Sequence, residues 1–319
     1  MKNKTAIVLF NLGGPDSLEA VQPFLENLFN DPDIFKLPFQ KTLARYVSKK
    51  RAPKVQEEYK LIGGKSPLGM WTEKQRKMLQ NKLLLRGYKT DVFVAMRYWK
   101  PLTEETVKEV EKNDYGKIIL LPLYPHYSIS TTGSSFNEWK RQYREDPSRI
   151  IYIENYFDHP LYIKALNERI DEGLGKFPEN IRNEVQLVFS AHGTPVSYVR
   201  KGDPYSGQIK STMEAVMNLR GKDHEYHLCF QSKVGPAKWL EPATNKMIEE
   251  LAGKGKKHQL IIPISFVSDH IETLYELEIE YRHTAEKAGV ENYIVMEGLN
   301  DSQVFIDALY ELAAERMNK

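Results

Sequence analysis

Short apolar runs alternate along this chain with longer stretches in which apolar residues recur at every third or fourth position. Runs of four to eight apolar or β-branched residues predict β-strands, whereas the longer periodic stretches predict amphipathic helices. Alternating strands and helices are typical of parallel sheets with helical crossovers. Several runs are apolar almost throughout, as expected for strands that helices cover on both faces of the sheet. The pattern therefore predicts an α/β fold.

The pattern defines eight candidate strands with helical stretches between them. The expected strands cover residues 5–12, 91–97, 117–123, 150–154, 185–190, 227–231, 259–264 and 293–297. The clearest helical stretches cover residues 103–113, 161–174, 242–252 and 302–317. Eight strands would make one wide sheet, and residues 122–130 offer a break. We therefore predict two similar α/β halves, formed by residues 1–122 with 302–319 and by residues 123–301.

Composition narrows the class of protein without naming it. The 319 residues are enough for two domains with sizeable cores. A net charge of +2, from 45 basic and 43 acidic residues, gives no bias toward nucleic acid, so we expect no nucleic-acid partner. The single cysteine, Cys229, excludes an intrachain disulfide and any cluster held by several thiolates of this chain.

Two segments bear on where the protein resides. The apolar stretch before Gly13 is too short for a signal peptide or a membrane span, so we expect a cytoplasmic protein. Residues 35–47 mix large apolar side chains with lysine and arginine. This segment is either buried core or an apolar lip that covers a hydrophobic ligand or rests on a membrane surface.

An acidic segment follows the seventh expected strand, and its residues Glu272, Glu276 and Glu280 recur at every fourth position. On an α-helix these three carboxylates would lie on one face. Like charges at this spacing weaken a helix slightly. The stripe is therefore either a solvated acidic helix start or a ladder of oxygen ligands and proton acceptors for a cation.

His192 ends the fifth expected strand, where ligand sites of open α/β sheets are found. Gly193 and Pro195 enforce a turn directly after it, which would expose the imidazole. Such a histidine is either a structural hydrogen-bonding residue, or a general base or metal ligand. Together with the carboxylates it describes a site for iron(II), cobalt, nickel or zinc. Gly13-Gly14 lacks the rest of a phosphate-binding loop, so a nucleotide cofactor is poorly supported.

Several segments match the motifs of one family over nearly the whole chain. The most specific are residues 187–195 with 200–205, around His192, and residues 266–276, around Glu272. Further matches are residues 11–15, 51–54, 62–68, 124–125, 130–135, 231–236 and 239–240. On these residues the sequence resembles the ferrochelatases, which insert iron(II) into a porphyrin at the end of haem synthesis.

The resemblance implies a fold of two Rossmann-like halves, each a parallel sheet flanked by helices, with a porphyrin cleft between them. It implies that His192 and Glu272 are the catalytic residues and contact the substrate iron. It also implies a set of porphyrin-binding residues, with the first three at the propionates: Arg51, Tyr59, Ser66, Leu12, Arg97, Tyr98 and Trp239. A path for protons or metal ions would include Asp269, Glu276 and Glu280.

Cofactors and partners follow from the same resemblance. We expect no permanent cofactor, because Fe2+ enters as a substrate. We expect no iron–sulfur cluster, because the chain has one cysteine and carries Ile129 where some cluster-bearing relatives have a ligand cysteine. The expected partners are porphyrin and ferrous iron, with peripheral contact of residues 35–47 at the inner face of a membrane.

The resemblance leaves more than one activity open. The favoured activity is a ferrochelatase that converts protoporphyrin IX to protohaem with release of two protons. The alternatives are insertion of iron into coproporphyrin III, a cobalt or nickel chelatase of the same fold, and a non-catalytic tetrapyrrole carrier. A carrier would not need a proton acceptor beside its ligands, so His192 and Glu272 favour an enzyme.

Overall fold

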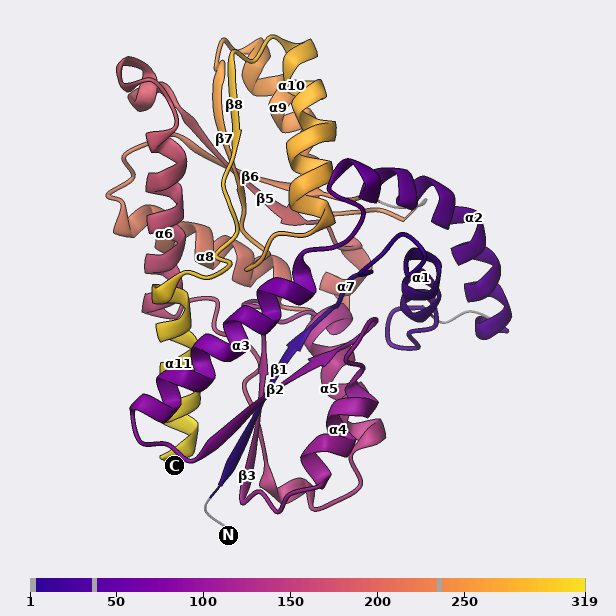
Figure 1. The fold of residues 1–319 in the computed structure, drawn as a ribbon. Helices are drawn as coiled ribbons and strands as arrows, with labels where there is room; N and C mark the ends of the chain where they lie inside the picture. Colours follow the sequence, from indigo (N-terminus) through magenta and orange to yellow (C-terminus); the bar gives the residue numbers. More distant parts are fainter. Residues whose placement is uncertain (1–3, 36–38, 234–236, 319) are drawn as a thin grey trace. The chain divides into compact units, whose positions relative to one another are not determined.

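The computed structural model describes residues 4–35, 39–233 and 237–318 (Figure 1). The chain divides into two compact units. Unit 1 consists of Met1–Tyr156 and Asp301–Lys319, and unit 2 consists of Phe157–Asn300. Each unit is built around its own parallel sheet of four strands.

The sheet of unit 1 has the strand order β2-β1-β3-β4. Its strands are β1 (Thr5–Asn11), β2 (Thr90–Met96), β3 (Lys117–Pro122) and β4 (Ile150–Tyr152). All neighbouring strands are parallel, and Leu9 of β1 lies between Val94 of β2 and Leu121 of β3. Every residue of β1 is buried, which explains why this run is apolar almost without interruption.

Helices connect these strands and pack against the sheet to form the core of unit 1. They are α1 (Val21–Phe29), α2 (Gln40–Leu61), α3 (Leu68–Leu85), α4 (Thr103–Glu111), the π-helix η1 (Ile129–Gly133), α5 (Ser134–Gln142), the 3-10 helix η2 (Pro147–Arg149) and α11 (Gln303–Met317). The core packs Phe10 of β1 against Phe136 and Trp139 of α5. The C-terminal helix α11 lies beside α3 (Figure 1), and Lys82 pairs with Asp307 there.

Unit 2 repeats this architecture with the strand order β6-β5-β7-β8. Its strands are β5 (Gln186–His192), β6 (Tyr226–Gln231), β7 (His258–Pro263) and β8 (Asn292–Val295). Its helices are α6 (Pro160–Gly175), the 3-10 helix η3 (Glu179–Glu184), α7 (Val196–Arg200), α8 (Tyr205–Leu219), α9 (Thr244–Gly253), the π-helix η4 (Glu272–Glu280) and α10 (Tyr281–Ala288). All strand pairs are again parallel.

The predicted α/β fold with two parallel sheets is confirmed, and each of the eight expected strands is present within a few residues of its expected bounds. The expected boundary between the halves, after residue 122, is wrong. Ile118 of β3 pairs with Ile150 of β4, so residues 123–156 belong to unit 1 and not to the second half. The short β4 completes an edge of the sheet of unit 1.

The order of the strands determines where each sheet can bind a ligand. In both units the chain leaves the first strand toward one side of the sheet and later returns to its other side. Ligands bind beyond the carboxyl ends of the strands where this direction changes. In unit 2 this point lies between β5 and β7, and in unit 1 it lies between β1 and β3. Among the described residues, no helix is both long and apolar enough to cross a membrane.

Candidate active site

His192 is the last residue of β5 and therefore lies at the switch point of unit 2. Its backbone is held by two side chains from neighbouring segments. The N–H of His192 donates to Ser265 Oγ at 2.9 Å, and Tyr205 donates its hydroxyl to the carbonyl of His192 at 3.0 Å. These bonds fix the direction in which the imidazole leaves the strand.

Gly193 allows the chain to turn directly after His192. A Cβ atom at this position would lie 2.6 Å from the carbonyl oxygen of Gln231 and 3.4 Å from Cε3 of Trp239. The N–H of Gly193 donates to that same carbonyl at 2.9 Å. Trp239 thus packs against the turn, and Pro195 forms a β-bridge with it. A side chain at this position would force the turn or the backbone of β6 to shift.

Glu272 begins η4, the segment expected to be an α-helix from its four-residue spacing. The structure corrects this expectation, because Glu272–Glu280 forms a nine-residue π-helix. A π-helix is held by hydrogen bonds between residues five apart, is rare, and is found frequently at functional sites. The spacing of the carboxylates does not distinguish the two helix types, since residues four apart lie on similar sides of both.

The imidazole and the first carboxylate of η4 form a direct pair. Nδ1 of His192 lies 2.8 Å from Oε2 of Glu272, and Gln231 donates its amide Nε2 to the same oxygen at 3.2 Å. The other oxygen of Glu272 lies 3.9 Å from Nε2 of His270. The side chains of His192 and Glu272 are 38% and 22% exposed, so both remain accessible to a ligand.

Ser232 extends this pair to a second carboxylate. Its Oγ lies 3.1 Å from Oε2 of Glu272 and 2.5 Å from Oε2 of Glu276, and its N–H donates to Oε1 of Glu276 at 2.8 Å. Tyr281 donates its hydroxyl to Glu276 Oε1 at 2.8 Å. The backbone of Ser232 has a φ of 63°, an uncommon conformation for a residue with a side chain. The result is a continuous hydrogen-bonded chain from His192 to Tyr281, which we call the carboxylate chain.

Protons are distributed unequally along the carboxylate chain. Burial disfavours charge on His192, but the Glu272 carboxylate more than offsets burial and raises the pKa of the imidazole. Burial likewise opposes charge on Glu272, yet the charge and hydrogen bond of His192 hold its pKa well below its usual range. The pKa of Glu276 is raised, by burial first and then by the neighbouring charge of Glu272. Neighbouring groups with pKa values pushed apart are typical of acid–base sites.

The structure brings Glu276 into this chain but places Asp269 and Glu280 elsewhere. Asp269 is buried, and its carboxylate accepts from Thr273 Oγ1 at 3.0 Å and from Asn300 Nδ2 at 2.6 Å. These bonds tie down the loop that leads into η4. Glu280 is exposed at the far end of η4.

Arg97 and Tyr98, expected from the resemblance to bind porphyrin, meet in unit 1 around Asp31. Nη2 of Arg97 lies 3.0 Å from Oδ1 of Asp31, and Tyr98 donates its hydroxyl to Oδ2 of Asp31 at 2.7 Å. The Arg97 side chain is 9% exposed and that of Asp31 is fully buried. The two predicted residues therefore share one buried acceptor.

The other predicted residues of unit 1 lie in different settings. Leu12 is partly buried against the core, whereas Arg51 is exposed with its guanidinium 5.7 Å from the Phe29 ring. Tyr59 is buried. Ser66 is buried where its Oγ accepts from the N–H of Leu68 at 3.3 Å. Within unit 1, Leu12 lies beside the Arg97–Tyr98 pair, because its carbonyl accepts from the N–H of Tyr98 at 2.9 Å.

Sequence reasoning missed several residues that the structure adds. Ser232, Gln231 and Tyr281 join the carboxylate chain, and His270 lies beside Glu272. A signal was available for two of them. Gln231 ends β6 and Ser232 follows it, β6 neighbours β5, and the carboxyl ends of adjacent parallel strands meet at one edge of a sheet.

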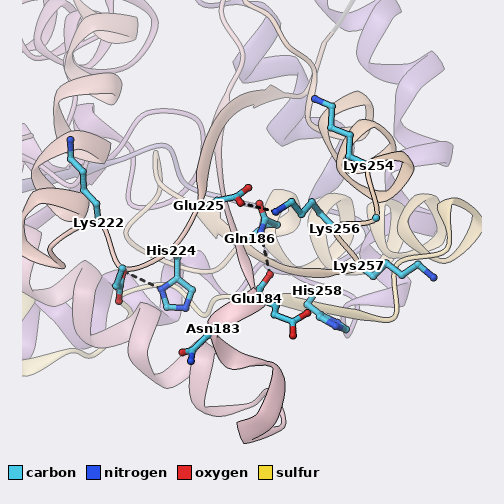
Figure 2. A pocket seen from close by; sticks show the side chains of 12 residues that line it. Asn183, Glu184, Gln186, Lys222, His224, Glu225, Lys254, Lys256, Lys257 and His258 are labelled. Carbon is cyan, nitrogen blue, oxygen red and sulfur yellow. Dashed lines mark hydrogen bonds and ion pairs between the residues drawn. The ribbon is translucent and has the colours of Figure 1, made fainter.

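A polar cavity of about 650 Å³ lies at the opposite edge of the sheet of unit 2 (Figure 2). It is formed at the amino ends of β5, β6 and β7, near Gln186, Glu225 and His258. Lys256 in its wall pairs with Glu225 at 2.6 Å. None of the predicted site residues lines this cavity. Ligand sites of such sheets are expected beyond the carboxyl ends of the strands, whereas this cavity lies at their amino ends.

Comparison with known proteins gives a consistent result. A family model described as Ferrochelatase matches residues 4–317. The chain is 49% identical to the ferrochelatase of Geotalea uraniireducens over 317 residues, which cover 98% of each chain. It is 48% identical to the ferrochelatase of Aquifex aeolicus over 312 residues, covering 97% of this chain and 98% of that one.

Solved structures show the same fold at much lower sequence identity. SirB from Bacillus subtilis with Fe3+ matches with a TM-score of 0.54 at 13% identity, over 98% of this chain and 95% of that one. DR2241 from Deinococcus radiodurans, a multi-domain protein with structural similarity to chelatases, matches with a TM-score of 0.56 at 11% identity, over 98% of this chain and 55% of that one. With the family model and the curated relatives, the result is plain: the chain belongs to the ferrochelatase family.

Proposed function

We propose that this chelatase inserts Fe2+ into protoporphyrin IX to form protohaem. The observation that carries the proposal is the contact of 2.8 Å between His192 and Glu272 at the switch point of unit 2. Relatives that are 48–49% identical are named ferrochelatase, which supports iron as the metal. An imidazole and a carboxylate supply both a proton acceptor and nitrogen and oxygen ligands for iron(II).

The reaction requires two N–H bonds of the porphyrin to break while iron(II) exchanges its water ligands for pyrrole nitrogens. Two protons leave, and no electron is transferred. His192 accepts a proton or contacts iron only as a neutral imidazole, and Glu272 acts as a carboxylate. We assign the proton acceptor and the iron contact to this pair jointly.

A proton taken up by the pair has a route away from the substrate. A serine hydroxyl has one hydrogen, so Ser232 can donate to only one of its two carboxylates at a time. If Glu276 carries a proton, it donates to Ser232 Oγ across 2.5 Å, and Ser232 then donates to Glu272. We propose that Glu276 receives the protons and that exposed Glu280 stands at the solvent end. We propose that Asp269 acts by holding the loop before η4.

Porphyrin binding in this proposal involves Leu12, Arg51, Tyr59, Ser66, Arg97, Tyr98 and Trp239. Arg51 supports this assignment through its exposure, because a guanidinium pairs with a propionate carboxylate in a bidentate geometry. Trp239 lies against the turn that follows His192, so it offers an aromatic surface beside the proposed reacting groups. The buried hydroxyl of Tyr98 is bonded to Asp31, so we assign Tyr98 a role through that cluster.

We further propose that residues 35–47 contact the inner face of a membrane. Phe39 is 89% exposed and Tyr46 is 55% exposed, and Lys41 and Arg45 are exposed near them. Aromatic and basic side chains together suit an anionic lipid surface. Residues 36–38 of this segment lie outside the described residues. Phe39→Ser should reduce co-sedimentation with phosphatidylglycerol vesicles, whereas Leu85→Ser, which changes an 88% exposed residue elsewhere, should not.

The activity is tested by mixing the purified protein anaerobically with Fe2+ and either protoporphyrin IX or coproporphyrin III. Haem absorption should appear with many turnovers and faster with protoporphyrin IX. Formation of only one equivalent would indicate a carrier. Preference for coproporphyrin III, or faster insertion of cobalt or nickel, would replace the proposed substrate or metal.

The matched variants are His192→Ala and Glu272→Gln, with His258→Gln as the control. His258 lines the cavity at the opposite edge of the same sheet. The first two variants should lose metal insertion while remaining folded, and the control should keep the parent rate. Parent rates in folded His192→Ala and Glu272→Gln would contradict the assignment of the site.

A further inference from the structure

Asp31, which follows α1, is a buried carboxylate that receives hydrogen bonds from several parts of unit 1. Arg97 Nη2 lies 3.0 Å from Oδ1, and the N–H of Asp33 donates to Oδ1 at 2.8 Å. Tyr98 donates its hydroxyl to Oδ2 at 2.7 Å, and Ser134 donates its hydroxyl to the same oxygen. The side chain of Asp31 has no exposed surface. Both oxygens of the carboxylate are therefore satisfied without water.

These contacts fix one edge of the Arg97 guanidinium. Nε donates to Ser134 Oγ at 2.8 Å, and Nη2 faces Asp31, with Glu138 Oε2 at 3.7 Å. The guanidinium also lies 5.2 Å from the centre of the Tyr98 ring. Nη1 makes no hydrogen bond to any residue that the structure describes. The side chain is thus held on one edge, while the Nη1 edge is left to bind another acceptor.

A buried ion pair contributes little net stability compared with a well-packed apolar pair, because both charges lose water. Stability alone is therefore a weak reason for this arrangement. Arg97 directly follows β2, beyond the carboxyl end of a strand, where α/β sheets bind ligands. A guanidinium held in one orientation before the ligand arrives loses less conformational entropy on binding.

We propose that Asp31 is a positioning residue, which orients Arg97 so that its Nη1 edge donates to an acceptor on the porphyrin substrate. This inference rests on the proposed function. Asp31 itself does not touch the substrate in this proposal. Its effect on porphyrin binding is exerted through Arg97 and so depends on the guanidinium of that residue.

The test compares KM for porphyrin and kcat in four proteins: wild type, Asp31→Asn, Arg97→Lys and the double variant. Asparagine keeps the shape of Asp31 but loses its charge. Asp31→Asn should raise KM about tenfold and change kcat less than about twofold, because the orientation of Arg97 is loosened while His192 and Glu272 are intact. In the Arg97→Lys background no fork remains to be oriented, so the same change should alter KM less than about twofold.

The matched control is Asp33→Asn, two residues away, whose carboxylate pairs with Arg141 at 2.7 Å and not with Arg97. It should leave KM unchanged. If Asp31→Asn does not fold, Ser134→Ala removes a neutral partner of both Asp31 and Arg97 and should raise KM about threefold, again only when Arg97 is present.

An equal rise of KM in both backgrounds, or a parent KM in the folded variants, overturns the positioning role. Failure of the proposed function is distinguished by the wild type, which would then make no metalloporphyrin at all. In that event, quenching of porphyrin fluorescence still compares Kd across the same four proteins. Coupling between residues 31 and 97 in Kd supports the positioning role, and independent effects overturn it.

Discussion

Each unit has a histidine near the carboxyl end of a central strand of its sheet, and the pKa values of the two imidazoles are shifted in opposite directions. His126 follows β3 in unit 1 and is buried, and burial lowers its pKa to about 3. His192 ends β5 in unit 2, and its pKa is raised because the Glu272 carboxylate more than offsets burial. Burial acts in the same direction on both imidazoles. The difference shows that the Glu272 carboxylate at the start of η4 reverses the effect of burial on the pKa of an imidazole.

The ionic clusters of the two units also differ, in the exposure of their side chains and in the groups to which they connect. In unit 1, Asp31 and Arg97 are fully or almost fully buried and hold each other in place. In unit 2, His192 and Glu272 keep partial exposure and connect through Ser232 to Glu276. The first arrangement suits orientation of a ligand, and the second suits transfer of protons.

The largest effect is expected from removing the Glu272 carboxylate, which distinguishes the setting of His192 from that of His126. Glu272→Gln should lower kcat for metal insertion by about a thousandfold, because His192 loses both its charge partner and its neighbouring acceptor. The measurement is the rate of haem formation from saturating porphyrin and Fe2+. Near-wild-type kcat would show that the pair is not the reacting centre.

Substitutions in the buried Asp31–Arg97 cluster of unit 1 should change the free energy of unfolding. Arg97→Leu leaves the Asp31 carboxylate without its cation and should lower the free energy of unfolding by about 3–5 kcal/mol. Adding Asp31→Asn should recover much of this loss, because the uncompensated charge is then gone. Urea unfolding of the three proteins measures both effects. Equal stability of Arg97→Leu and the double variant would contradict charge pairing as the cause.

Ser232 tests whether the carboxylates of unit 2 act as a chain. Ser232→Gly accepts the φ of 63° but removes the hydroxyl between Glu272 and Glu276, and it should lower kcat about tenfold. Ser232→Ala should lower kcat similarly and be less stable, because alanine at positive φ is strained. Circular dichroism and haem formation separate the two effects. Unchanged turnover in Ser232→Gly would exclude a role for the hydroxyl.

The two histidines should also give opposite dependences of stability on pH. The folded-state pKa of His126 lies below its unfolded value, so its burial destabilises the protein as pH falls from about 6.5 toward 3, by up to about 1.4 kcal/mol per pH unit. The folded-state pKa of His192 is raised, so its pair with Glu272 stabilises fully below about 6.5 and loses this effect as pH rises through the folded pKa.

His126→Gln and His192→Gln, compared with wild type by urea unfolding between pH 5 and 9, resolve the two contributions. The cost of losing His192 should shrink toward pH 9, whereas wild type should lose its advantage over His126→Gln toward pH 5. The effect should build up gradually with pH, since each change involves one proton. Parallel pH curves for wild type and both variants would contradict the assigned charge states.

The sequence predicted the strands well because their apolar runs depend on local pattern and on burial from both faces. The boundary between the units was missed because β4 has only three residues, and its pairing with β3 is a contact between distant segments. His192 and Glu272 were found through the ends of strands and the family motifs. The contact of Glu272 with Ser232 and that of Arg97 with Asp31 join residues tens of positions apart, which periodicity does not detect.

The close approach at Gly193 has a genetic consequence. Every amino acid other than glycine adds a Cβ, and that atom would lie 2.6 Å from the Gln231 carbonyl oxygen. Any missense change of this codon therefore requires the turn or the Gln231 carbonyl to shift, and the turn is what directs His192 toward Glu272. A single methyl group at a residue without chemistry of its own should therefore lower activity by displacing the histidine beside it.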